Sequence, residues 1–198
     1  DKLNRSLERT GMVYLHAPLF ARAMKFVAPI RRFIGFPTVF NLLGPIVNPS
    51  QPKCQLLGVA NLDQMRLYNN VYRKIGIDYA IENSIEGYDE ISLTGNFKIT
   101  TNDYERIFSP ADIGMQQTQA SELMGGETKE DAMRIFDSVL ANTATESQKN
   151  VVITNAAFAI QVMERGKKSI DECIAIARES LESGRAEETL KKFIEINS

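Results

Sequence analysis

A strand–helix–strand pattern in the middle of the chain most constrains the fold. Residues 55–59 form a short apolar run, residues 63–75 repeat apolar side chains at helical spacing, and residues 79–81 begin a second apolar run. Alternation of strands with helices is typical of βαβ units, in which the two strands pair in parallel. We therefore expect an α/β fold with a partly parallel central sheet flanked by helices.

The flanking segments extend this prediction. Residues 1–10 and 19–35 have helical spacing, the second with a break near Pro29, and residues 12–15 and 37–41 have strand character. Alternating polar and apolar residues over 97–108 predict a hairpin. The C-terminal part is predicted to be mostly helical, over 118–124, 127–141, 146–165, 168–183 and 185–196.

Composition narrows the class of protein. The formal net charge is -2 and the isoelectric point is about 5.6, which disfavours a nucleic-acid-binding module because such modules carry a basic excess. One histidine and two distant cysteines, Cys54 and Cys173, have no zinc-ligand spacing, and we expect reduced thiols in a cytoplasmic protein. No apolar run reaches the length of about 18 residues needed to span a bilayer.

Three motifs occur in a fixed order along the chain. The first is an arginine pair at residues 31–32, followed by Thr-Val-Phe and by Asn-Leu-Leu-Gly-Pro-Ile-Val-Asn-Pro at residues 41–49. The second is Gly-Tyr-Asp-Glu-Ile-Ser at residues 87–92, and the third is Asn-Ala-Ala at residues 155–157. Together with a late glycine, Gly184, these motifs resemble the anthranilate phosphoribosyltransferases over nearly the whole chain.

The resemblance implies a fold and an activity. Residues 1–198 would be the C-terminal part of a phosphoribosyltransferase catalytic α/β domain. The parent enzyme would transfer a phosphoribosyl group from phosphoribosyl pyrophosphate to anthranilate, in tryptophan biosynthesis, and would be a homodimer. The family's Gly-Thr-Gly-Gly-Asp and Lys-His-Gly-Asn phosphate loops do not occur in these residues, and neither does its N-terminal helical domain. We therefore expect this incomplete domain to be inactive alone.

The resemblance also assigns two substrate-binding residues. Arg31 stands at the position that holds the carboxylate of anthranilate, and a planar guanidinium suits a carboxylate better than an ammonium does. Pro18 aligns with a proline that lines the path of the acid. The chain departs from the family pattern just after it, with Ala21-Arg22 in place of His-Pro, so we expect altered entry or secondary binding of the acid.

The resemblance also implies a metal site at Asp89 and Glu90, which match the family's Gly-x-Asp-Glu metal segment, whereas the residues alone leave an exposed acidic turn equally open. Neighbouring residues of a regular strand point in opposite directions, so both acids reach one region only if the backbone bends, which Gly87 permits. Mg²⁺ bound beside a diphosphate takes one or two carboxylates and keeps several waters. The neighbouring acids Glu82 and Glu86 have no such support. No residue of this chain is assigned as catalytic, because positioning and charge neutralisation would supply most of the rate.

Some assignments stay open. Asn41, Asn48 and Asn155 are expected to be structural, and Asn155 on an apolar helix would need a buried partner, commonly backbone. Two other functions fit the same fold. A pyrimidine nucleoside phosphorylase shares a softened form of the first motif but fits the Gly-x-Asp-Glu turn less well. A non-catalytic nucleic-acid-binding relative is disfavoured by the acidic balance and by the Asp89-Glu90 pair.

Overall fold

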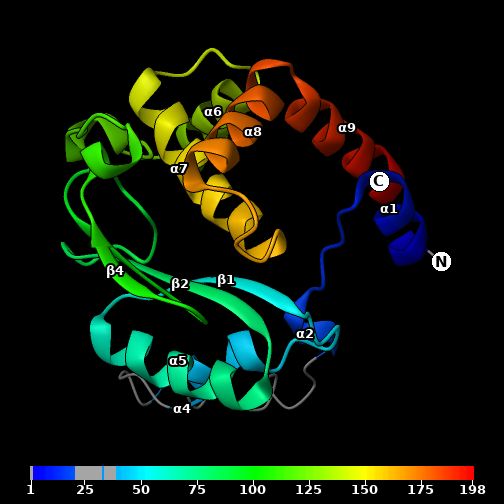
Figure 1. Ribbon diagram of the computed structural model, residues 1–198. Helices are drawn as coiled ribbons and strands as arrows, with labels where there is room; N and C mark the ends of the chain where they lie inside the picture. The colour runs from blue at the N-terminus through cyan, green and yellow to red at the C-terminus, as the bar shows by residue number, and fades with distance from the viewer. Residues whose placement is uncertain (1, 21–32, 34–38) are drawn as a thin grey trace. The chain divides into compact units, whose positions relative to one another are not determined.

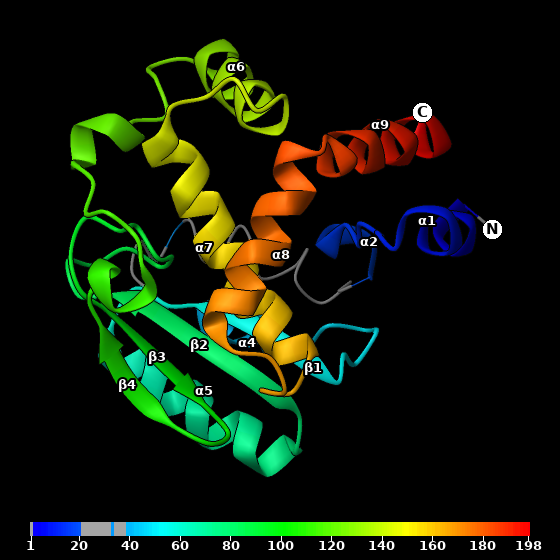
Figure 2. The ribbon, with the colours of Figure 1, turned by 45° about the horizontal axis from the view of Figure 1, so that its top comes forward.

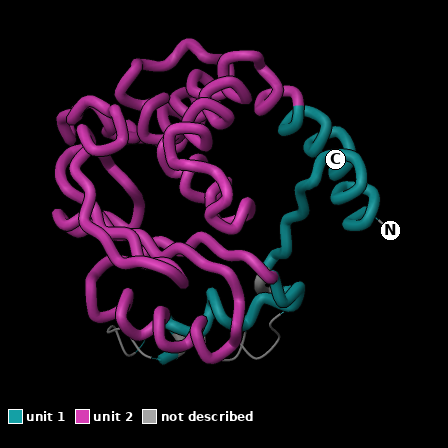
Figure 3. The backbone as a smooth tube through the Cα atoms, viewed as in Figure 1, with its two compact units in different colours: residues 1–52, 189–198 teal, residues 53–188 magenta. Residues whose placement is uncertain are grey.

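The computed structural model describes residues 2–20, 33 and 39–198. The chain forms two compact units, which Figure 3 shows in different colours. One unit contains residues 1–52 with 189–198, and the other contains residues 53–188. All four strands of the described sheet belong to the second unit, so the α/β fold predicted from the strand–helix–strand pattern is found there.

A mixed four-stranded sheet organises the second unit, in the order β1-β2-β3-β4 (Figure 1). Strand β1 (Cys54–Gly58) runs parallel to β2 (Asp78–Ser84). Strands β3 (Phe97–Thr101) and β4 (Glu105–Phe108) continue the sheet in antiparallel pairing. Both the parallel βαβ pair and the hairpin predicted from sequence are confirmed.

Helix α5 (Leu62–Ile75) connects β1 to β2 and covers one face of the sheet (Figure 1). The side chain of Asn61 caps its first turn by accepting a hydrogen bond from the backbone N–H of Gln64, and Gly76 ends it in the left-handed conformation. Its buried face packs on the sheet through aromatic rings, with Tyr72 and Tyr79 centroids 5.4 Å apart. The helix thereby fixes β2 beside β1.

Helices α7 (Glu146–Met163) and α8 (Ile170–Glu182) cover the opposite face (Figure 2). Each begins at a capping box, formed by Thr145 with Gln148 and by Ser169 with Glu172, which satisfies free backbone N–H groups of the first turn. The core between α7 and the sheet contains three phenylalanines with ring centroids 5.6 to 5.9 Å apart. They are Phe97, Phe108 and Phe158.

The remaining elements are helical, as the prediction for the C-terminal part required. In the second unit they are the 3-10 turns η2 (Pro110–Ile113) and η3 (Ala120–Leu123) and helix α6 (Lys129–Leu140). Helix α9 (Arg185–Asn197) crosses from the second unit into the first. None of the helices that the structure describes is both long and apolar enough to cross a membrane.

The first unit contains α1 (Lys2–Thr10), α2 (Ala17–Phe20), α4 (Val39–Leu43) and the 3-10 turn η1 (Gly44–Ile46). Buried Ser6 of α1 accepts a hydrogen bond from the amide of Asn197, 3.1 Å away. This contact joins the first described helix to the end of the last one.

Two strand predictions were wrong. The described part of residues 37–41 is helical, since α4 begins at Val39. At the end of this helix, the carbonyl of Leu43 accepts a hydrogen bond from the backbone N–H of Val47 and not from a neighbouring strand. Residues 12–15 form no strand, and the backbone N–H of Met12 bonds instead to the Thr10 hydroxyl, 3.1 Å away. An apolar run without a strand beside it has no ladder in which to pair its backbone groups.

Candidate metal site

The Asp89-Glu90 pair lies on an exposed turn directly after β2. Gly87 adopts a φ of 105°, which favours glycine, and its N–H donates to the carbonyl of Ser84 at 2.9 Å. The N–H of Ser84 in turn donates to the carbonyl of Tyr88 at 3.0 Å. The backbone therefore bends back on the end of β2, and the bend at Gly87 is the one predicted from the sequence.

Strand β1 approaches this turn so closely that only glycine fits at its last position. A Cβ placed on Gly58 would lie 1.5 Å from the backbone oxygen of Asp89, far inside any allowed contact. A side chain at position 58 would therefore displace the turn. The sequence showed a glycine at the end of an apolar run, but the reason for it is this tertiary contact.

Asn155 of α7 holds the other side of the turn. Its Oδ1 accepts from the N–H of Ile91 at 3.0 Å, and its Nδ2 donates to the carbonyl of Ile91 at 2.9 Å. The same Nδ2 lies 2.8 Å from the carbonyl of Val151, one helical turn earlier. The amide thus fixes the residue that follows Glu90 to the helix, and the backbone of buried Ile91 is the partner that Asn155 was expected to need.

A third contact fixes Glu90 itself. The hydroxyl of Ser84 donates to the carbonyl of Glu90 at 2.6 Å and accepts from the N–H of Ser92 at 3.1 Å. Both serines are buried. The turn is therefore held by β1, β2 and α7 together, while the Asp89-Glu90 pair stays exposed.

Asp89 and Glu90 line an open pocket of about 740 Å³ within the second unit. Its other described lining residues are mostly small or apolar, except for Glu82 and Asn155, and include no lysine, arginine or histidine. The full described lining is Leu56, Gly58, Glu82, Asp89, Glu90, Val151, Val152, Asn155, Ala156 and Ala159. The pocket is therefore strongly acidic.

Glu82 is the residue of this pocket that the sequence prediction missed. It lies in β2 with only 4% of its surface exposed. Burial raises the pKa of its carboxyl to about 8, and the nearby charges of Glu90 and Asp89 contribute to the rise. The available signal was a lone acid inside a run that reads Tyr-Ala-Ile-Glu, because a charged side chain in a central strand is rare unless paired.

The donor set suits a small hard cation. Carboxylate oxygens are the ligands that Mg²⁺ takes in proteins, and an acidic pocket without a neighbouring cationic side chain in its described lining leaves their charge uncompensated. Among the described residues, no three side chains of the metal-binding types are arranged to hold one ion together. A cation at this pocket would therefore have at most two of the described side chains as ligands and would keep waters.

The structure does not test the two predicted substrate-binding residues, Arg31 and Pro18. Arg31 lies outside the described residues, as do Ala21 and Arg22. Pro18 is part of the short helix α2 in the first unit. The role of Arg31 in holding the carboxylate of anthranilate therefore stays a prediction.

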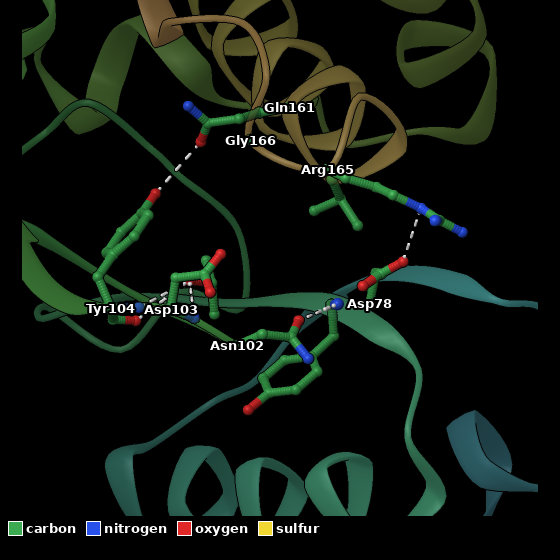
Figure 4. A pocket seen from close by; sticks show the side chains of 10 residues that line it. Asp78, Asn102, Asp103, Tyr104, Gln161, Arg165 and Gly166 are labelled. Atoms are coloured by element: carbon green, nitrogen blue, oxygen red, sulfur yellow. Dashed lines mark hydrogen bonds and ion pairs between the residues drawn. The ribbon is translucent and has the colours of Figure 1, made fainter.

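A second, smaller pocket of about 340 Å³ lies within the second unit, near the β3–β4 turn and the end of α7 (Figure 4). Several of its polar side chains are bonded to protein groups. Arg165 Nε lies 3.1 Å from Asp78 Oδ2, and the Tyr104 hydroxyl donates to Gln161 at 3.2 Å. The amide of Asn102 accepts from the backbone N–H of Tyr79 at 2.9 Å.

Comparison with known proteins identifies the family. The model of the glycosyl transferase family, a/b domain, matches residues 1–187. The chain belongs to this family. An anthranilate phosphoribosyltransferase from Phocaeicola vulgatus is 58% identical over 198 residues, which are 100% of this chain and 60% of that protein. The chain thus spans about three fifths of the length of this relative.

Solved structures of two anthranilate phosphoribosyltransferases have the same fold. Anthranilate phosphoribosyltransferase from Thermus thermophilus aligns with a TM-score of 0.90 at 27% identity, covering 99% of this chain and 59% of that one. The enzyme from Saccharomyces cerevisiae in complex with PRPP and Mg aligns with a TM-score of 0.85 at 26% identity, covering 98% and 55%. The resemblance inferred from the three motifs is confirmed.

Proposed function

We propose that this chain provides the metal-binding part of an anthranilate phosphoribosyltransferase, with Asp89 and Glu90 as the protein ligands of Mg²⁺. The observation that carries the proposal is the way the turn is built. Three separate elements fix the backbone of an exposed acid pair at one acidic pocket. A solvated acidic loop needs no such support. The Saccharomyces cerevisiae relative, which was solved with PRPP and Mg, supports the choice of metal.

The parent reaction joins the amine of anthranilate to C1 of the ribose, while the bond from C1 to pyrophosphate breaks. A bound Mg²⁺ would offset the negative charge that grows on pyrophosphate as it leaves. Asp89 and Glu90 would place that charge compensation at one fixed point, because their backbone is held by β1, β2 and α7. Preorganised electrostatics of this kind needs no acid or base from this chain.

Anthranilate recognition is proposed for Arg31, with Pro18 lining the path of the acid. We also propose that the whole protein is a cytoplasmic homodimer, as the family resemblance implies. Calorimetry with anthranilate tests the arginine directly. Arg31→Ala should abolish the heat of binding, whereas Arg32→Ala, which removes the neighbouring charge, should retain it. Equal heats for the unmodified chain and the Arg31 variant would remove the role of that side chain.

The metal proposal is tested by titrating the chain with Mg²⁺ in a calorimeter. Asp89→Asn and Glu90→Gln should each weaken binding at least about tenfold, because a carboxylate ligand is replaced by a neutral amide. Asp63→Asn, an exposed acid on α5, is the matched control and should bind like the unmodified chain. Unchanged affinity in both site variants would contradict the proposal.

Turnover by this chain alone is not expected, because its residues include no glycine-rich diphosphate loop. Fluorescence of anthranilate, followed in the presence of phosphoribosyl pyrophosphate and Mg²⁺, should stay constant. A steady decrease that depends on Asp89 would show that these residues suffice for catalysis.

A further inference from the structure

Glu82 has an unusual environment for an acid. Only 4% of its surface is accessible, and its Oε2 atom has no hydrogen-bond partner among the described residues. Buried carboxylates in folded proteins are normally paired, hydrogen-bonded or bound to a metal. An oxygen that lacks all three therefore points to a partner that is not part of the described chain.

The position of Glu82 in β2 decides where that partner would come from. Ala80 belongs to the core on the α7 face of the sheet, and Glu82, two residues later, lies on the same face. There it lines the acidic pocket together with Asp89 and Glu90. A partner for Oε2 can therefore be reached from the same pocket as the predicted metal ligands.

The amide donors near this pocket are already used. Asn83 Nδ2 lies 2.7 Å from the carbonyl of Val59 and 3.3 Å from that of Tyr88. Asn155 Nδ2 donates to two backbone carbonyls, at 2.9 and 2.8 Å. The charged groups that act on Glu82 are themselves acids, Glu90 and Asp89. A missing partner must therefore bring hydrogen-bond donors and, to be compatible with two acids, positive charge.

We propose that Glu82 is a third acidic member of the metal site, where it accepts a hydrogen bond from a water carried by the cation. The inference rests on the proposed role of Asp89 and Glu90. Direct ligation is disfavoured, because no three described side chains of the metal-binding types are arranged around one point. Mg²⁺ keeps several of its waters in proteins, and these supply the donors that Oε2 lacks. Glu82 is thus a positioning residue for the hydrated cation.

Electron paramagnetic resonance of Mn²⁺, which occupies the same kind of oxygen site, measures this role without any turnover. Glu82→Gln keeps the shape of the side chain and removes its capacity to act as an anionic acceptor. We expect it to raise the Kd for Mn²⁺ about tenfold, in the range seen for groups that bond to metal-bound ligands. Glu130→Gln, an exposed acid on α6 of the same unit, is the matched control, and its Kd should stay close to that of the unmodified chain.

Asp89→Asn separates the two proposals. If Asp89→Asn loses Mn²⁺ and Glu82→Gln binds it like the unmodified chain, the role of Glu82 is wrong and the metal site stands. If neither variant differs from the unmodified chain, the metal site itself is wrong. A thermal melt of each variant confirms that it is folded.

Discussion

Two pockets of the second unit differ in how their charged side chains are paired. The pocket at the β3–β4 turn is the smaller, about 340 Å³. Of its two acids, Asp78 and Asp103, the first is paired with Arg165, and the Tyr104 hydroxyl is bonded to Gln161. The pocket at the Asp89-Glu90 turn, about 740 Å³, is lined by three acids, and one buried oxygen of Glu82 has no partner among the described residues. Unsatisfied charge, and not the cavity alone, distinguishes a candidate ligand site.

The same contrast applies to the backbone. Around the acidic pocket, Gly58, Ser84 and Asn155 fix a turn whose acid pair remains exposed. At the β3–β4 pocket several polar side chains bond to one another and to nearby backbone. The second unit therefore presents acids at one pocket and pairs an acid with a base at the other.

The largest expected effect comes from Glu82 in the absence of metal. Its folded pKa, about 8, lies above its ordinary value of 4.5, so between these pH values the folded chain holds a proton that the unfolded chain has lost. Its contribution therefore makes the free energy of unfolding fall as pH rises from 4.5 to about 8, by at most about 5 kcal/mol at about 1.36 kcal/mol per unit.

Glu82→Gln removes this contribution. Urea unfolding in a chelator, followed by tyrosine fluorescence at about pH 5 and about pH 8, should show a smaller loss of stability with pH in the variant than in the unmodified chain. Equal losses would mean that Glu82 is not held neutral by its surroundings.

Gly58→Ala should have the next largest effect. The new Cβ would collide with the backbone oxygen of Asp89, so β1 or the turn must move, at a cost of about 3 kcal/mol. Urea unfolding measures the loss, and Mn²⁺ binding should weaken because the turn is displaced. Gly125→Ala adds a Cβ with no atom within 4 Å and serves as the control. A stable variant that binds Mn²⁺ normally would show that the turn is not positioned by this contact.

Asn155→Ala should destabilise the chain by about 2 kcal/mol, because the backbone N–H and C=O of Ile91 lose the Asn155 amide and are left unpaired in partly buried surroundings. Asn70→Ala, an exposed position on α5, should stay within about 0.5 kcal/mol. Unfolding midpoints in urea compare the two variants. If both lose the same small amount, the Asn155 contacts do not hold the turn.

Arg165→Ala should have the smallest effect. Its ion pair with Asp78 is exposed, with 62% and 39% of the two side chains accessible, and such pairs contribute about 0.5 kcal/mol. The residue has a φ of 53°, which alanine tolerates no better than arginine, so the change isolates the ion pair. The unfolding free energy should fall slightly and Mn²⁺ affinity should not change. A large loss of Mn²⁺ affinity would indicate that the cation binds at the β3–β4 pocket and not at the Asp89-Glu90 turn.

Local patterns made much of the fold predictable. The strand–helix–strand unit and the hairpin follow from the spacing of apolar residues, and Gly87 marked the bend that carries Asp89 and Glu90. The prediction that Asn155 bonds to buried backbone was also correct. In each case the information lies within one segment of the chain.

The missed features depend on contacts between distant segments. Glu82 is buried because α7 covers its face of β2, and nothing within the run Tyr-Ala-Ile-Glu states which face is covered. Gly58 is required because the turn after the next strand approaches it. The strand predicted over residues 37–41 failed for the same reason, since strand formation depends on a neighbour that sequence spacing does not reveal.

Anomalous diffraction from a crystal of this chain soaked in Mn²⁺ would locate the cation itself. We expect a peak at the acidic pocket, about 2.1 Å from carboxylate oxygens of Asp89 and Glu90. It also predicts that Glu82 Oε2 reaches the ion through a water. A peak at Asp78 in the β3–β4 pocket, with none at the Asp89-Glu90 turn, would contradict it.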